Sequence, residues 1–93
     1  MIVHVSARAT ADLAAIRAWI AADEAAAAQS MVAKLIYRMA NLTTMPRVGR
    51  VVPEIGQERI REVLEGKYRI VYRIDDDTLA VLTVFEGHQQ LRL

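Results

Sequence analysis

Cysteine is absent from this 93-residue chain, and only two prolines and four glycines interrupt it. The lack of cysteine excludes a disulfide scaffold and a thiolate metal site, and it suits a reducing compartment. Aromatic residues make up only 5% of the chain, so a core must be built from aliphatic side chains and methionine. A chain of this length is expected to form one domain, residues 1–93.

Long apolar runs and a strong net charge are missing as well. No run approaches the roughly 20 residues that span a bilayer, and the first residues lack the basic segment of a signal peptide. The formal net charge is +1, which does not favour direct binding of nucleic acid. We therefore expect a cytoplasmic protein that contacts neither a membrane nor, directly, a nucleic acid.

Apolar periodicity predicts one short strand followed by a helical hairpin. Residues 2–5 are β-prone, and Ser6 is placed to cap the helix that follows. A second helix is expected over residues 24–42, and the short connection makes the two helices antiparallel. The recurring apolar residues are Ala9, Leu13, Ile16 and Ile20 in the first helix and Ala28, Met31, Leu35, Met39 and Leu42 in the second.

The second half of the chain reads as a loop followed by three strands. Residues 43–57 contain both prolines and two glycines, which predicts a loop whose valine-rich middle lies extended against the helices. Strands are expected over residues 59–65, 68–74 and 78–86, and three consecutive aspartates between the last two suggest a solvated turn. The order β-α-α-β-β-β predicts an α+β fold in which a helical hairpin packs on a small antiparallel sheet.

Two arginines on the middle predicted strand are the strongest candidates for chemistry. Arg69 and Arg73 alternate with apolar residues, so both project from one face. Arginine in a sheet must meet carboxylates, phosphates or solvent. Structural pairing with Glu62, Glu86 or Asp12 and a functional role are both open at this stage. No nucleotide-binding loop, paired-histidine site or nucleophile elbow is present, so neither a cofactor nor a metal is expected.

Three further residues flank these arginines. Tyr68 and Tyr72 share the opposite face of the strand, and we expect them to be half-buried with their hydroxyls at the edge of the core. His88 follows Gly87 at the end of the last strand, where no acidic partner is evident. It is either an inert surface residue or a catalytic one.

These segments resemble the ParE/RelE superfamily of toxins from bacterial type II toxin–antitoxin systems. The matching segments are ADLAAIRAWI, PRVGRVVPE, IREVLEGKYRIVYRI and LTVFEGHQQL, which cover nearly the whole chain in order. The loop GRVVPE and the strand pair are similar to the ParE, or plasmid-stabilisation, branch. The element order inferred from periodicity agrees with the fold of that family.

The resemblance implies one of two activities. RelE-like members cleave mRNA on the ribosome, whereas ParE-like members inhibit DNA gyrase without known catalysis. Of the RelE catalytic positions only Arg69 matches, because Ile60 and Glu62 stand where lysines are expected and Gln89 where an arginine is expected. We therefore expect a gyrase inhibitor that a cognate antitoxin neutralises in a hetero-oligomer. The alternatives are a ribosome-dependent endonuclease that uses Arg69 and His88, and an inactive member that only binds its antitoxin.

The resemblance also suggests where partners bind. Candidate residues for target binding or toxicity are Arg61, Arg69, Arg73, His88 and Arg92. An antitoxin is expected to wrap the helices and the sheet with an amphipathic segment. Candidate residues for that contact are Trp19, Ile36, Tyr37, Val51 and Val52.

Overall fold

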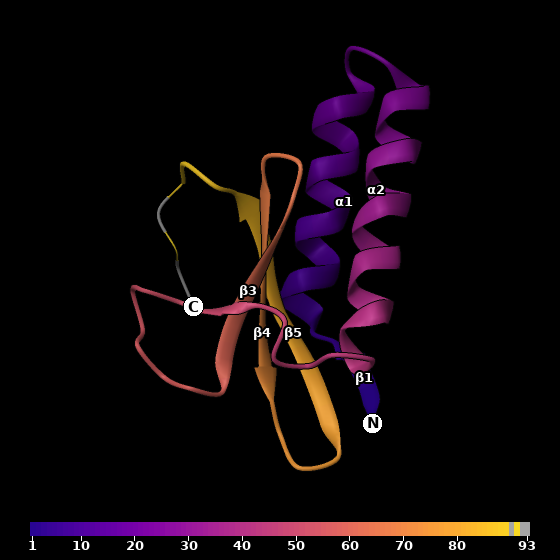
Figure 1. Cartoon of the computed structure of the whole chain (residues 1–93). Helices are drawn as coiled ribbons and strands as arrows, with labels where there is room; N and C mark the ends of the chain where they lie inside the picture. Colours follow the sequence, from indigo (N-terminus) through magenta and orange to yellow (C-terminus); the bar gives the residue numbers. More distant parts are fainter. Residues whose placement is uncertain (90, 92–93) are drawn as a thin grey trace.

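A helical hairpin covers one face of a five-stranded sheet in the computed structural model, which describes residues 1–89 and 91 (Figure 1). The elements, in chain order, are β1 (Ile2–Val5), α1 (Ala7–Ala21), α2 (Ala25–Ala40), the 3-10 turn η1 (Asn41–Thr43), β2 (Arg50–Val51), β3 (Ile60–Glu65), β4 (Tyr68–Ile74) and β5 (Thr78–Glu86). The predicted α+β fold with its helical hairpin is confirmed. None of the helices in the described part of the chain is long and apolar enough to cross a membrane.

The sheet is mixed, and it is wider than the predicted antiparallel sheet. Its strand order is β1-β5-β4-β3-β2. The β3–β4–β5 meander is antiparallel as expected, but β1 runs parallel to β5, with Ile2 opposite Thr78. Within the valine-rich part of the predicted loop, Arg50 and Val51 form β2 and pair with β3, Arg50 opposite Glu62. Both edge strands are short, which limits pairing with other chains.

The start of α1 takes over from β1 as the partner of β5. Ser6 caps α1 as predicted, because its hydroxyl accepts a hydrogen bond from the N–H of Ala9 at 3.0 Å. The same hydroxyl donates to the carbonyl of Leu82 at 3.0 Å, one residue beyond the end of β1 pairing. Asp12 then accepts from the N–H of Val84 at 3.0 Å. The edge of β5 that β1 leaves uncovered is therefore satisfied by side chains of α1 and its cap.

The predicted apolar stripes of both helices meet the sheet in one core. Tyr68 and Tyr72 belong to this core and are 2% and 0% exposed, so the expectation that they are half-buried is wrong. Both belong to β4, the central strand, and pack in the core beneath the hairpin, where aromatic side chains contribute large apolar area. The core residues are Ala9, Ile16, Leu35, Met39, Leu42, Val63, Tyr68, Ile70, Tyr72, Leu79, Val81 and Val84.

Candidate functional site

Arg69 lies on the face of β4 that points away from the helices, and two carboxylates occupy its guanidinium. Its Nε donates to Glu62 Oε1 at 2.7 Å, and its two terminal nitrogens donate to the two oxygens of Glu54 at 2.9 Å each. Glu62 comes from β3, whereas Glu54 comes from the loop that follows β2. The ring of Phe85, opposite Arg69 in β5, lies 4.9 Å from the guanidinium carbon. The Arg69 side chain is thus 8% exposed and held on three sides.

This cluster carries no net charge. Glu62, whose side chain is 1% exposed, also accepts from Arg50 Nε at 2.6 Å, so two arginines face two glutamates. The hydrogen bonds from Arg69 lower the pKa of Glu54 from 4.5 to about 2. The hydrogen bonds to Glu54 and Glu62 raise the pKa of Arg69 above its ordinary value. A neutral, fully hydrogen-bonded cluster supplies little positive potential for binding a phosphate.

A buried tyrosine holds the segment that leads into β2. The Tyr72 hydroxyl accepts from the N–H of Gly49 at 3.0 Å and donates to the carbonyl of Pro46 at 2.6 Å. Burial raises the pKa of Tyr72, so the hydroxyl stays protonated. Arg61 adds a bond from Nη1 to the carbonyl of Gly49 at 2.9 Å. A Cβ atom at Gly49 would lie 2.5 Å from the carbonyl oxygen of Glu62, so the backbone approaches β3 as closely as glycine permits.

The other predicted basic residues of the sheet also have acidic partners. Arg61 pairs with Glu58 at 2.6 Å, and its side chain is only 12% exposed. Arg73 pairs with Asp75 at 3.0 Å, not with any of the three acids that we predicted. Asp75 also meets Arg59 at 3.3 Å, and the hydrogen bonds from Arg73 lower its pKa, so the aspartate turn is not simply solvated as predicted. Asp75 is the partner of Arg73 because it stands only two residues after it, just past the end of β4.

His88 is exposed beyond the end of β5, and it has an acidic partner that we did not predict from the sequence. Its Nδ1 lies 3.3 Å from Glu86 Oε2, and Lys67 Nζ lies 3.7 Å from the other oxygen of Glu86. The only signal for this pair in the sequence is proximity, because Glu86 stands two residues before His88. Arg92, predicted to act nearby, lies outside the described residues.

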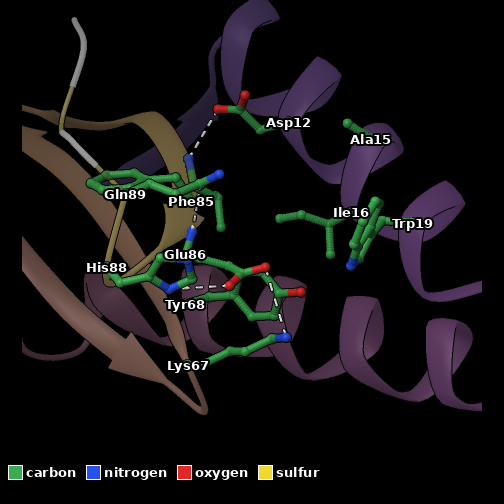
Figure 2. Close-up of a pocket in the computed structure, with 11 residues that line it drawn as sticks. Asp12, Ala15, Ile16, Trp19, Lys67, Tyr68, Phe85, Glu86, His88 and Gln89 are labelled. Carbon is green, nitrogen blue, oxygen red and sulfur yellow. Dashed lines mark hydrogen bonds and ion pairs between the residues drawn. The ribbon is translucent and has the colours of Figure 1, made fainter.

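His88 and Glu86 line a cavity of about 650 Å³ between α1 and the adjacent ends of β4 and β5 (Figure 2). Asp12, Ile16 and Trp19 form its helical wall. Arg69 is not among the described residues that line it, so the two residues predicted for a nuclease site do not share this cavity. Within residues 1–89 and 91, no three His, Asp or Glu side chains gather as potential metal ligands.

The residues predicted to contact an antitoxin differ in exposure. Trp19 and Tyr37 are 72% and 73% exposed on the two helices, and Ile36 is half exposed. Val51 is partly exposed in β2. Val52 is completely buried, and its N–H donates to the carbonyl of Ile60 at 3.1 Å. Its burial argues against the predicted antitoxin contact at Val52.

Comparisons with known proteins identify a matching family and similar folds. The sequence model of a family described as the ParE toxin of a type II toxin–antitoxin system, parDE, matches residues 3–91. A search of curated proteins found no match. A chain of the chromosomal ParDE toxin–antitoxin system from P. aeruginosa superposes with a TM-score of 0.76 at 19% identity, covering 92% of this chain and 95% of that one. A chain of the toxin–antitoxin complex RelBE2 from Mycobacterium tuberculosis gives a TM-score of 0.65 at 24% identity, covering 91% and 95%. At these identities the two structures establish a shared fold.

Proposed function

Because the chain belongs to the ParE toxin family of type II toxin–antitoxin systems, we propose that it inhibits DNA gyrase by binding it and that a cognate antitoxin neutralises it. The family match over residues 3–91 carries this proposal. The chemistry of the sheet supports binding over catalysis. The antitoxin complex would be a hetero-oligomer.

Cleavage of RNA needs several catalytic groups, and the arginines of this sheet are already paired with carboxylates. A nuclease must activate a 2′-hydroxyl, offset phosphate charge and protonate a leaving group. The Arg69 guanidinium is occupied by Glu62 and Glu54, and the cluster is neutral. A phosphate would have to displace a carboxylate and would still meet the buried negative charge of Glu62. This arrangement favours a toxin that acts by binding.

The exposed side chains of the hairpin support an antitoxin partner. Trp19, Ile36 and Tyr37 leave much of their apolar surface in solvent. Large exposed apolar side chains are typical of protein interfaces, and an amphipathic segment that lies along the helices would cover them. We place the first antitoxin contacts at these three residues, with Val51 at the margin.

An mRNA endonuclease is the second candidate, and the contact between His88 and Glu86 favours it. A carboxylate beside Nδ1 orients an imidazole so that the other nitrogen is available for proton transfer. The fold shared with a chain of the RelBE2 complex is consistent with either activity. A third candidate is an inactive family member that only binds its antitoxin.

Two assays with purified protein separate these candidates. We expect inhibition of supercoiling by DNA gyrase on relaxed plasmid, and no cleavage of mRNA on translating ribosomes. Cleavage on ribosomes without any effect on gyrase would overturn the proposal. Antitoxin binding with no response in either assay would identify the inactive member.

His88→Gln is the sharper test of the nuclease, because the side chain is 77% exposed and its loss should not disturb the fold. His4→Gln is the matched control, since His4 is the other histidine and is exposed on β1. We expect both variants to keep the toxicity of the wild type. A loss of toxicity confined to His88→Gln would favour the nuclease.

A further inference from the structure

The cavity beside α1 carries a negative charge that residues 1–89 and 91 do not neutralise. Asp12 Oδ2 accepts from the Thr83 hydroxyl at 2.6 Å and from the Val84 N–H at 3.0 Å. Neither donor is a cation, and no described side chain forms an ion pair with Asp12. Asp12 Oδ1 accepts no hydrogen bond within the described part of the chain. A half-buried carboxylate with a free oxygen is suited to a charged donor.

A second polar group of the cavity also lacks a partner. Tyr68 is 2% exposed, and its hydroxyl is buried without any hydrogen bond from the described residues. Figure 2 shows this hydroxyl turned toward the side of the cavity that Ile16 and Trp19 form. A buried hydroxyl without a partner destabilises a fold, because it has lost its hydrogen bonds to water. A ligand group that reached Tyr68 would remove that cost.

The other residues that line the cavity indicate which kind of ligand it would bind. Glu86 is already paired with Lys67 and His88, so the charge of Asp12 is left in excess and disfavours a phosphate. The Trp19 side chain lines the cavity while 72% exposed, and indole rings attract cations. A cation on an aliphatic stem matches this combination of carboxylate, hydroxyl and aromatic ring.

We propose that this cavity binds the side chain of an arginine or lysine presented by a protein partner. The aliphatic stem packs on Ile16 and Trp19. The charged head donates to Asp12 Oδ1 and to the Tyr68 oxygen. The identification of that partner as the antitoxin rests on the proposed function, whereas the preference of the cavity for a basic side chain does not.

A small probe tests the cavity directly. N-acetyl-arginine N-methylamide is titrated into the full chain, and binding is followed by the fluorescence of Trp19, the only tryptophan. The matched probe is the corresponding citrulline amide, which has nearly the same shape without the charge. We expect saturable binding of the arginine probe in the millimolar range and about tenfold weaker binding of citrulline.

Two variants report on the groups assigned to the site. Asp12→Asn keeps an oxygen for Thr83 and Val84 but removes the charge, so it should bring arginine to the affinity of citrulline. Tyr68→Phe removes only the hydroxyl without a partner and should weaken arginine binding severalfold while the protein stays folded. Asp76→Asn, in the turn at the far end of the β4–β5 hairpin, should bind like the wild type. Equal affinity for the two probes, no binding up to 50 mM, or no effect of Asp12→Asn would overturn the inference.

The same variants separate the cavity from the proposed function. With purified antitoxin, Asp12→Asn should weaken the complex about tenfold. An antitoxin that binds the wild type and Asp12→Asn equally would overturn the inference and leave the proposed function intact. The absence of any antitoxin complex with the wild type would overturn the proposed function, and the arginine probe would still decide on the cavity.

Discussion

The partners of Arg69 favour a structural role for this residue over a functional one. Its position on the strand suggested either a salt bridge or a functional cation, and the contacts with Glu62 and Glu54 satisfy its donors from both sides. Loss of toxicity in an Arg69 variant would therefore not identify a catalytic residue. Its stability must be measured first.

We expect Arg69→Ala to lower the free energy of unfolding by about 3–5 kcal/mol, because it leaves the buried Glu62 with only the exposed Arg50 as a cation. The double variant Arg69→Met with Glu62→Met should recover most of that loss, since it removes both buried charges. Urea denaturation of the three proteins tests this. A loss under about 1 kcal/mol for Arg69→Ala would show that the ion pair is not a structural element.

Gly49 gives a second prediction at this scale. We expect Gly49→Ala to destabilise the protein by about 1–3 kcal/mol, because the new methyl group would meet the Glu62 carbonyl at 2.5 Å and the Tyr72 hydroxyl at 2.6 Å. Gly87→Ala is the control, since its nearest neighbour would be 3.4 Å away. Thermal unfolding monitored by circular dichroism measures both. Equal melting temperatures for the two variants would contradict this account of the loop.

At the scale of the elements, the loop between β2 and β3 makes the free energy of unfolding depend on pH. The folded-state pKa of Glu54 is about 2, below its ordinary value of 4.5, so its bond to Arg69 stabilises the fold above about pH 4.5 and is lost as the pH falls toward 2. The lowered pKa of Asp75 acts in the same direction. We expect Glu54→Gln to reduce the free energy of unfolding at pH 7 and to match the wild type near pH 2.

Urea denaturation between pH 7 and pH 2 checks this dependence. Asp76→Asn, an exposed acid without an ion pair in the described structure, serves as the control and should follow the wild-type curve. A constant difference between Glu54→Gln and the wild type across this range would rule out the ion pair as its source.

Some elements could be predicted from local sequence patterns, whereas others depend on contacts with distant parts of the chain. The helices, the cap at Ser6 and the β3–β4–β5 meander follow from spacing and turn residues, and the structure confirms them. The two-residue β2 is too short for alternation to reveal, and the parallel pairing of β1 depends on a strand at the other end of the chain. The resemblance likewise identified the family but not the partners of Arg69. Glu54 and Arg69 stand 15 residues apart in the sequence, so no local pattern encodes their contact.

At the scale of the whole molecule, the exposed aromatic residues predict a separation of stability from binding. We expect Trp19→Ser and Tyr37→Ser each to change the free energy of unfolding by less than about 0.5 kcal/mol, because both side chains are largely in solvent. Each should weaken the antitoxin complex at least tenfold, as central aromatic residues of interfaces commonly do. Isothermal titration calorimetry measures the affinity.

Leu64→Ser is the control for this pair. Leu64 is 60% exposed on β3, on the sheet face opposite the helices, so its loss should leave antitoxin affinity unchanged. A weaker complex for Leu64→Ser than for the helix variants would move the interface to the other face.

The position of β5 between β1 and β4 also sets the order of events during synthesis. The ribosome makes both neighbours of β5 before β5 itself. Until residues 78–86 emerge, β1 has no strand partner, and the apolar stripes of α1 and α2 lack the part of their cover that β5 provides. Pairing between distant segments slows folding, and uncovered apolar surface attracts other proteins. A nascent chain arrested before Thr78 should therefore be bound by chaperones, and it should gain its protection against proteases in one step once the last strand is added.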